Sequence, residues 1–205
     1  MRLSARLEHI CSELAYFEGR RKLGQSFKDY FSEAKYVDRD KILMVLGPGR
    51  SGKDTVANFI ARNTNLTFTG SSSKYLCQFV AQGYYEEFYS IRHDYKEMLF
   101  DLGNAIRDYE LSLIPITTLA YNDILCGLRD GREVEYIIKS LKPASVLWIH
   151  RNVPEDITMG FTLLDVNRYC IESNTRLDHV SNNTTKAYLY GCVSNILTQL
   201  DVELL

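Results

Sequence analysis

A glycine-rich segment between an apolar run and a helix-compatible stretch constrains this sequence more than any other feature. Residues 42–46 read Ile-Leu-Met-Val-Leu, and residues 47–53 read Gly-Pro-Gly-Arg-Ser-Gly-Lys. Val56, Phe59 and Ile60 then share one face of a helix. Glycines let the backbone curl so that successive N–H groups face an anion, and the positive end of the following helix faces the same anion. The pattern predicts a strand, a phosphate-binding P-loop and a helix.

Lys53 and Asp54 determine what such a loop can hold. The ammonium of Lys53 can reach the β- and γ-phosphates of ATP, and the alternative is a simple glycine turn with a solvated lysine. The residue after a P-loop lysine is normally Ser or Thr, whose hydroxyl binds Mg²⁺, whereas this chain has Asp54 followed by Thr55. The carboxylate can hold Mg²⁺ directly or through water. Alternatively, Asp54 only complements the positive helix end, an effect worth about 0.3–1 kcal/mol.

Composition indicates a globular chain, long enough for one domain with a sizeable core. The chain has 205 residues, of which 45% are hydrophobic and 24% charged, and its formal net charge is −2. This balance argues against general binding to nucleic acid or to a membrane surface. No apolar stretch approaches the roughly 18–20 residues of a membrane span, and no secretory signal is evident. Five scattered cysteines without a CxxC spacing fit reduced thiols in a cytoplasmic compartment.

Strand and helix patterns alternate from residue 42 onward. This alternation predicts an α/β domain with a mainly parallel, five-stranded sheet and helices on both faces. The expected strands are 42–46, 65–70, 123–127, 145–149 and 177–181. The expected helices are 53–62, 73–82, 94–110, 131–140 and 185–200. Residues 83–122 and 151–176 fit the alternation poorly and are expected to be insertions that cover ligands at the carboxyl ends of the strands.

Residues 1–37 precede the first strand and are expected to form a helical extension. Leu3, Leu7, Ile10, Leu14 and Phe17 alternate at spacings of four and three, as on an amphipathic helix. A second helical piece is expected around residues 27–34, followed by a connector at 37–41 and the main domain at 38–205. The stripe is expected to pack on the domain itself, with self-association as a homodimer the alternative.

Arginines occur where a phosphorylated acceptor would be held. An acceptor phosphate and ATP repel each other, so several guanidinium groups from different segments are needed. Arg129 and Arg151 directly follow the third and fourth expected strands, and Arg92 and Arg107 lie in the 83–122 insertion. A single surface arginine is more often solvated, and Arg92 and Arg107 can instead pair with aspartates along a helix.

The order of these motifs resembles the deoxynucleoside monophosphate kinases of bacteriophages, a branch of the P-loop nucleoside monophosphate kinase superfamily. The shared elements are Gly-Lys-Asp-Thr at 52–55, Leu-Gly-x-x-x-Arg at 102–107, Gly-Leu-Arg-x-x-x-Glu-Val-Glu at 127–135, the strand ending in Arg151, and Asn182-Asn183 before the last helix. The resemblance spans residues 41–200 and implies the three-layer P-loop kinase fold. The aspartate after the lysine also resembles animal phosphomevalonate kinases.

The resemblance implies roles at the matching positions. The ATP phosphates would be bound by Gly47, Pro48, Gly49, Arg50, Ser51, Gly52, Lys53, Asp54 and Thr55, with Mg²⁺ at Asp54. Lys53, Arg129 and Arg151 would act in catalysis, Arg151 as part of a lid at 151–176. The acceptor would be bound by Lys74, Arg92, Arg107, Arg129 and Glu133. Many relatives have Asp where this chain has Gly127, so Mg²⁺ would depend more on Asp54.

The expected function is ATP-dependent phosphorylation of (deoxy)nucleoside 5′-monophosphates to diphosphates, in a host cytoplasm if the chain is phage-encoded. One alternative is a kinase of another small phosphorylated metabolite, such as phosphomevalonate. The discriminating feature would be an aromatic surface for a base, which residues at 79–89 could form, although such residues are more often core. The family pattern, and no residue that reads a base, favours a nucleotide. The other alternative is a non-catalytic nucleotide-binding module that docks a partner through its first helix.

Overall fold

The computed structural model describes residues 3–34, 41–152 and 159–205. The chain divides into two compact units, one formed by residues 1–36 with 72–120 and the other by residues 37–71 with 121–205. The predicted boundary after residue 37 and residues 37–40 of the predicted connector lie outside the described residues. The sequence did not suggest that the N-terminal helices would group with residues 72–120.

The second unit is built on a sheet of four parallel strands. These are β1 (Leu43–Leu46), β2 (Ile124–Cys126), β3 (Ser145–His150) and β4 (Leu177–Ser181). Their spatial order is β2-β1-β3-β4, and each neighbouring pair is parallel. The α/β class, the parallel sheet and four of the expected strands are therefore confirmed.

The fifth strand, predicted at 65–70, is wrong, and the sheet has four strands rather than five. The backbone of this segment bonds to residues 122–124 without forming a strand ladder, and Thr67 O accepts from Asp123 N at 3.0 Å and from Ile124 N, the first residue of β2, at 3.3 Å. Thr67 N donates to Asp123 Oδ2 at 2.7 Å, and Thr69 N donates to Asn122 Oδ1 at 2.5 Å. Leu66 and Phe68 of the segment still pack against the apolar core, but no strand ladder forms.

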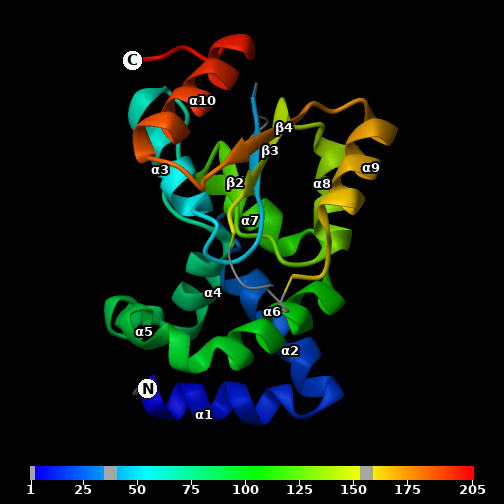
Figure 1. The fold of residues 1–205 in the computed structure, drawn as a ribbon. Coiled ribbons are helices and arrows are strands. Elements are labelled where there is room, and N and C mark those ends of the chain that lie inside the picture. The colour runs from blue at the N-terminus through cyan, green and yellow to red at the C-terminus, as the bar shows by residue number, and fades with distance from the viewer. Residues whose placement is uncertain (1–2, 35–40, 153–158) are drawn as a thin grey trace. The chain divides into compact units, whose positions relative to one another are not determined.

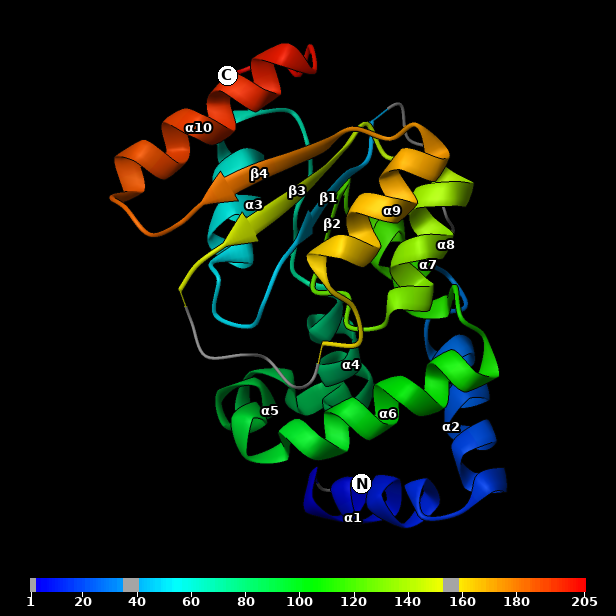
Figure 2. The same cartoon turned by 45° about the vertical axis from the view of Figure 1, so that its right-hand side comes forward.

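Helices cover both faces of this sheet (Figure 2). α3 (Lys53–Asn63) and α10 (Lys186–Gln199) lie on one face, and α8 (Gly131–Leu141) and α9 (Leu163–Ser173) lie on the other. Successive strand residues point to opposite faces. One apolar cluster joins alternate strand residues to α3 and α10, and it contains Leu43, Val45, Ile124, Cys126, Leu147, Ile149, Val180, Val56, Ile60, Leu189 and Val193. This arrangement is a three-layer α/β fold.

The described part of the first unit is built from helices (Figure 1). They are α1 (Leu3–Leu14), α2 (Phe17–Tyr30), α4 (Ser72–Ala81), α5 (Tyr85–Ile91), α6 (Lys96–Tyr109) and α7 (Leu113–Tyr121), with 3-10 turns at Gln82–Tyr84 and Arg92–Tyr95. None of the helices in the described ranges of the chain combines the length and the apolar character that crossing a bilayer requires.

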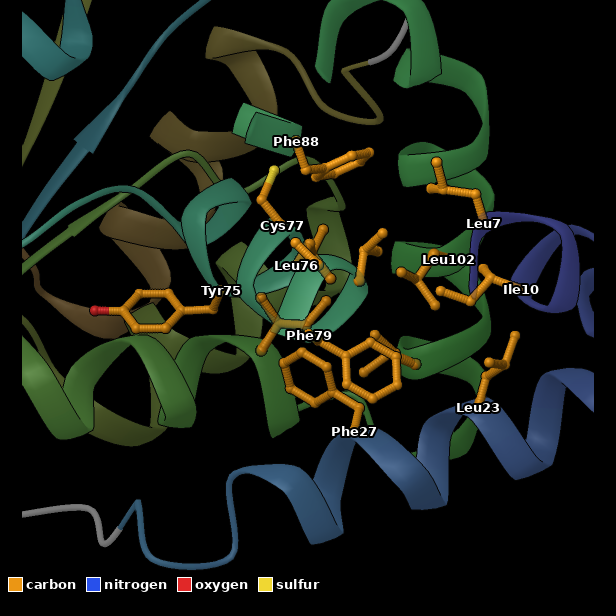
Figure 3. Packing of buried hydrophobic residues seen from close by; sticks show 14 of the residues in the cluster. Leu7, Ile10, Leu23, Phe27, Tyr75, Leu76, Cys77, Phe79, Phe88 and Leu102 are labelled. Carbon is orange, nitrogen blue, oxygen red and sulfur yellow. The ribbon is translucent and has the colours of Figure 1, made fainter. Parts of the chain in front are cut away.

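The N-terminal stripe packs within this helical unit. Leu7 and Ile10 of α1 join Phe27, Phe79 and Leu102 in one buried cluster (Figure 3). The rings of Phe27 and Phe79 meet edge to face, with centroids 5.4 Å apart. The predicted stripe ends earlier than expected, because α1 stops at residue 14 and the next apolar position, residue 17, is 84% exposed.

Arg6 connects α1 to the end of α4. Its Nε donates to Val80 O at 2.6 Å and its Nη2 donates to Phe79 O at 2.7 Å. Both carbonyls belong to the last turn of α4, where the helix offers them no donor of its own. The guanidinium also lies over the Phe79 ring, 5.2 Å from its centroid, and burial lowers the pKa of Arg6.

We expect Arg6→Ala to lower the free energy of unfolding by about 1.5–3 kcal/mol, because charge-assisted bonds to two helix-terminal carbonyls are lost. Arg6→Lys should recover only part of this loss, since an ammonium lacks the planar fork. Urea denaturation measures both variants. The matched control is Arg21→Ala, an exposed position on α2, where a change within about 0.5 kcal/mol is expected. Equal effects at both positions would contradict the capping role.

Candidate functional site

The glycine-rich loop (residues 47–52) leaves the carboxyl end of β1 and enters α3. Gly47 and Gly52 have φ of +138° and +96°, a region that favours glycine. A Cβ on Gly47 would lie 2.3 Å from Ile149 O, and one on Gly52 would lie 2.3 Å from Asn182 Nδ2. Gly47 therefore requires glycine for conformation and for space, because its neighbour is main chain, and Gly52 requires glycine for its conformation.

Two neighbouring segments support this loop. Asn182, which follows β4, donates from Nδ2 to Ser51 O at 2.7 Å, and its backbone N donates to His150 O at 2.7 Å. Arg151, directly after β3, donates from Nη1 to Arg50 O at 3.4 Å. Asn182 belongs to the Asn182-Asn183 pair before the last helix, for which the sequence alone gave no role. Its position just past the carboxyl end of a strand was the signal that could have identified it.

Lys53 lies with its ammonium on the loop. Its Nζ donates to Gly47 O at 2.7 Å and to Pro48 O at 2.5 Å, and the residue is only 9% exposed. A buried ammonium needs acceptors of this kind. The charge therefore stands at the first turn of α3, where backbone N–H groups and the helix dipole also favour an anion.

The hydroxyl of Ser51 is a buried polar group within the loop. Its Oγ is fully buried and has no hydrogen-bond partner among the described residues. The Oγ lies against the loop, 3.1 Å from where a Cβ on Gly47 would stand. Buried hydroxyls are normally hydrogen-bonded. A phosphate oxygen is an acceptor of the kind this hydroxyl lacks, so the loop fits a phosphate group.

Asp54, exposed in the first turn of α3, contacts the end of β2. Cys126 Sγ donates to Asp54 Oδ1 at 3.3 Å. Burial, followed by the negative charge of Asp54, raises the pKa of Cys126 well above its ordinary value. The nearby positive charges of Lys53 and Arg129 oppose this rise. Cys126 is therefore a protonated thiol at neutral pH.

The loop fits Mg²⁺ only as a companion of a nucleotide. No group of three or more His, Cys, Asp or Glu side chains forms a metal cage in the described ranges. Mg²⁺ at nucleotide sites usually takes one or two carboxylates together with water and substrate phosphates. Asp54 supplies one hard oxygen ligand, which suits that arrangement and not a permanently bound ion.

Three further predicted site residues belong to the same unit as the loop. Arg129 follows β2, and its carbonyl accepts from Gly160 N at 2.8 Å. Glu133 is fully buried in the first turn of α8. Arg151 is exposed and contacts the loop as described. Of the lid predicted at 151–176, residues 153–158 lie outside the described residues, and α9 occupies 163–173.

The remaining predicted acceptor residues, Lys74, Arg92 and Arg107, lie in the helical unit. Lys74 stands in the first turns of α4. Arg92 Nη1 donates to Tyr89 O, and its guanidinium stacks 3.7 Å from the centroid of that ring. Arg107 is buried in α6, and its Nη1 donates to Asn104 Oδ1 at 3.1 Å. Their role toward an acceptor stays a prediction.

The geometry around residues 47–54 can bind an anion at the mouth of a parallel sheet. It combines a curled main chain, a helix N-terminus, an ammonium and a carboxylate within one short segment. The chain matches no protein-family model, no curated protein and no solved structure.

Proposed function

We propose that the chain transfers the γ-phosphoryl group of ATP to the phosphate of a (deoxy)nucleoside 5′-monophosphate. The glycine-rich loop is the observation that carries this proposal. It joins β1 to α3 with left-handed backbone at Gly47 and Gly52, and Lys53 Nζ lies on its carbonyls. A loop of this kind at the carboxyl end of a parallel strand supports binding of a triphosphate.

The chemistry requires positioning and charge neutralisation more than covalent catalysis. On nucleotide binding, Lys53 would exchange the carbonyls of Gly47 and Pro48 for phosphate oxygens and stabilise charge on the transferred group. Asp54 would hold Mg²⁺, which supplies charge neutralisation when bound. An acceptor phosphate is already ionised, so the reaction needs no separate general base.

The arginines would hold and neutralise the two phosphate groups. Arg129 would bind the acceptor phosphate, and its charge already acts on Cys126 at the end of β2. Arg151 would steady the loop through Arg50 O and face the transferred group. Lys74, Arg92, Arg107 and Glu133 are each proposed as acceptor residues on the family resemblance alone. The choice of a nucleoside monophosphate as acceptor rests on the same resemblance and not on any side chain that would recognise a base.

A coupled assay of ADP release tests the proposal. The chain is mixed with ATP, Mg²⁺ and, separately, each (deoxy)nucleoside monophosphate and phosphomevalonate. We expect ADP release that depends on a nucleoside monophosphate, with ³¹P NMR showing one diphosphate product per ADP. Release only with phosphomevalonate would move the chain to another acceptor. ATP binding without acceptor-dependent release would leave a non-catalytic module.

The assay also separates the acceptor site from the ATP site. We expect Arg129→Ala to raise the KM for the acceptor far more than the KM for ATP. The control is Arg62→Ala, an exposed arginine in the last turn of α3, at the opposite end of that helix from the loop. An equal rise in both KM values for the Arg129 variant would remove this residue from the acceptor site.

A further inference from the structure

Cys126 stands at the place where β2 ends beside the glycine-rich loop. It pairs in parallel register with Val45 of β1, the strand that leads into the loop. Its side chain is fully buried between the sheet and α3, whereas Asp54 is exposed. The sheet therefore fixes the thiol, and the carboxylate of Asp54 is the group that can turn between rotamers.

The contact between the two side chains leaves the carboxylate with one oxygen bound and one open. Cys126 Sγ donates to Asp54 Oδ1 at 3.3 Å. A thiol is a weak donor, but a bond to an ionised acceptor is stronger than a neutral one. Among the described residues, no hydrogen bond reaches Asp54 Oδ2. The thiol thus selects one orientation of the carboxylate in which Oδ2 is available.

We propose that Cys126 is a positioning residue that holds Asp54 Oδ1 and so presents Oδ2 to the Mg²⁺ that accompanies a bound triphosphate. The inference rests on the proposed function. Sulfur is a soft ligand and Mg²⁺ prefers oxygen, so Cys126 acts through Asp54 and not as a metal ligand itself. The last residue of β2 and the residue after it are Cys126 and Gly127, so neither position supplies a carboxylate. The carboxylate of Asp54 would then be the proposed protein ligand of Mg²⁺, and its orientation would determine whether Oδ2 can reach the ion.

Calorimetric titration of ATP, with and without Mg²⁺, tests this role without relying on activity. Wild-type chain should bind ATP more tightly when Mg²⁺ is present. Cys126→Ala and Cys126→Val remove the donor with opposite changes in size, and both should reduce the Mg²⁺-dependent gain by about tenfold, as loss of a ligand's supporting bond does. ATP affinity without Mg²⁺ should stay unchanged. Cys126→Ser keeps a donor and should retain most of the gain.

The matched control is Cys170→Ala, which removes a buried thiol from α9 in the same unit without touching Asp54. It should leave the Mg²⁺-dependent gain at the wild-type value. A packing role for Cys126 would lower the melting temperature of its variants without changing the gain, and that result would overturn the proposal. If the alanine variant fails to fold, the same titration of the valine variant tests the proposal. Absence of ATP binding by wild-type chain would instead overturn the proposed function.

Discussion

Replacement of Lys53 by alanine is expected to abolish phosphoryl transfer while the chain stays folded. Lys53 Nζ is the ammonium that lies on the glycine-rich loop, on Gly47 O and Pro48 O. Removing one preorganised donor from a site of developing charge costs on the order of 10²–10³ in kcat. A charged donor that also binds the ground-state triphosphate should cost at least that much.

The measurement is the ADP-release assay with saturating nucleotide, accompanied by circular dichroism to verify folding. Lys22→Ala on α2 is the matched control, because Lys22 is exposed and belongs to neither the loop nor the acceptor set. That variant should keep wild-type activity. Near-normal turnover in the Lys53 variant would contradict the role given to the ammonium.

Gly47→Ala is expected to destabilise the chain and to remove ATP binding together. Its φ of +138° is unfavourable for any residue with a Cβ, and the added atom would lie 2.3 Å from Ile149 O. Backbone strain of this kind costs about 1–3 kcal/mol. Because the clash is with main chain of β3, relief requires the loop itself to move, which would displace the N–H groups that face a phosphate.

A second glycine provides the control for this substitution. Gly191 lies in α10, and a Cβ added there would meet nothing within 4 Å. Gly191→Ala should therefore raise stability by about 0.5–1 kcal/mol through helix propensity alone. Urea denaturation and ATP titration measure both variants. Retention of wild-type ATP affinity in the Gly47 variant would show that ATP binding does not depend on the observed conformation of the loop.

Local patterns in the sequence were sufficient to predict most of the sheet. The strands that flank the loop are continuous apolar runs, and four expected segments became β1 to β4. The loop itself was predictable because glycine spacing and the following helix are local features. The segment at 65–70 was mispredicted, since Asn122 and Asp123, more than 50 residues away, bond its backbone. No local pattern reveals such a partner.

The contacts between the site residues could not be predicted from their positions along the chain. The contact from Cys126 to Asp54 joins residues 72 positions apart, and the bond from Asn182 to Ser51 spans 131 positions. Both depend on which strand ends lie beside the loop, which follows from the strand order β2-β1-β3-β4. The sequence identified Asp54 by its unusual place after Lys53, but it could not show what holds the carboxylate.

The spacing of glycine and arginine in one motif has a local structural reason. In the run at 102–107, Gly103 and Arg107 lie one helical turn apart on α6. A Cβ on Gly103 would stand 2.9 Å from Arg107 Nη1, so the glycine leaves room for the guanidinium. The spacing therefore has a packing reason within the helical unit, whatever the arginine binds.

The most direct test of the account is an NMR titration of the ¹⁵N-labelled full chain with a non-hydrolysable ATP analogue and Mg²⁺. We expect saturable shifts of the backbone amides from Gly49 to Asp54, because their N–H groups would meet phosphate oxygens. The same titration with the Lys53→Ala variant should give weaker shifts. Amides of this segment that stay unmoved at millimolar analogue would contradict the claim that this loop binds a triphosphate.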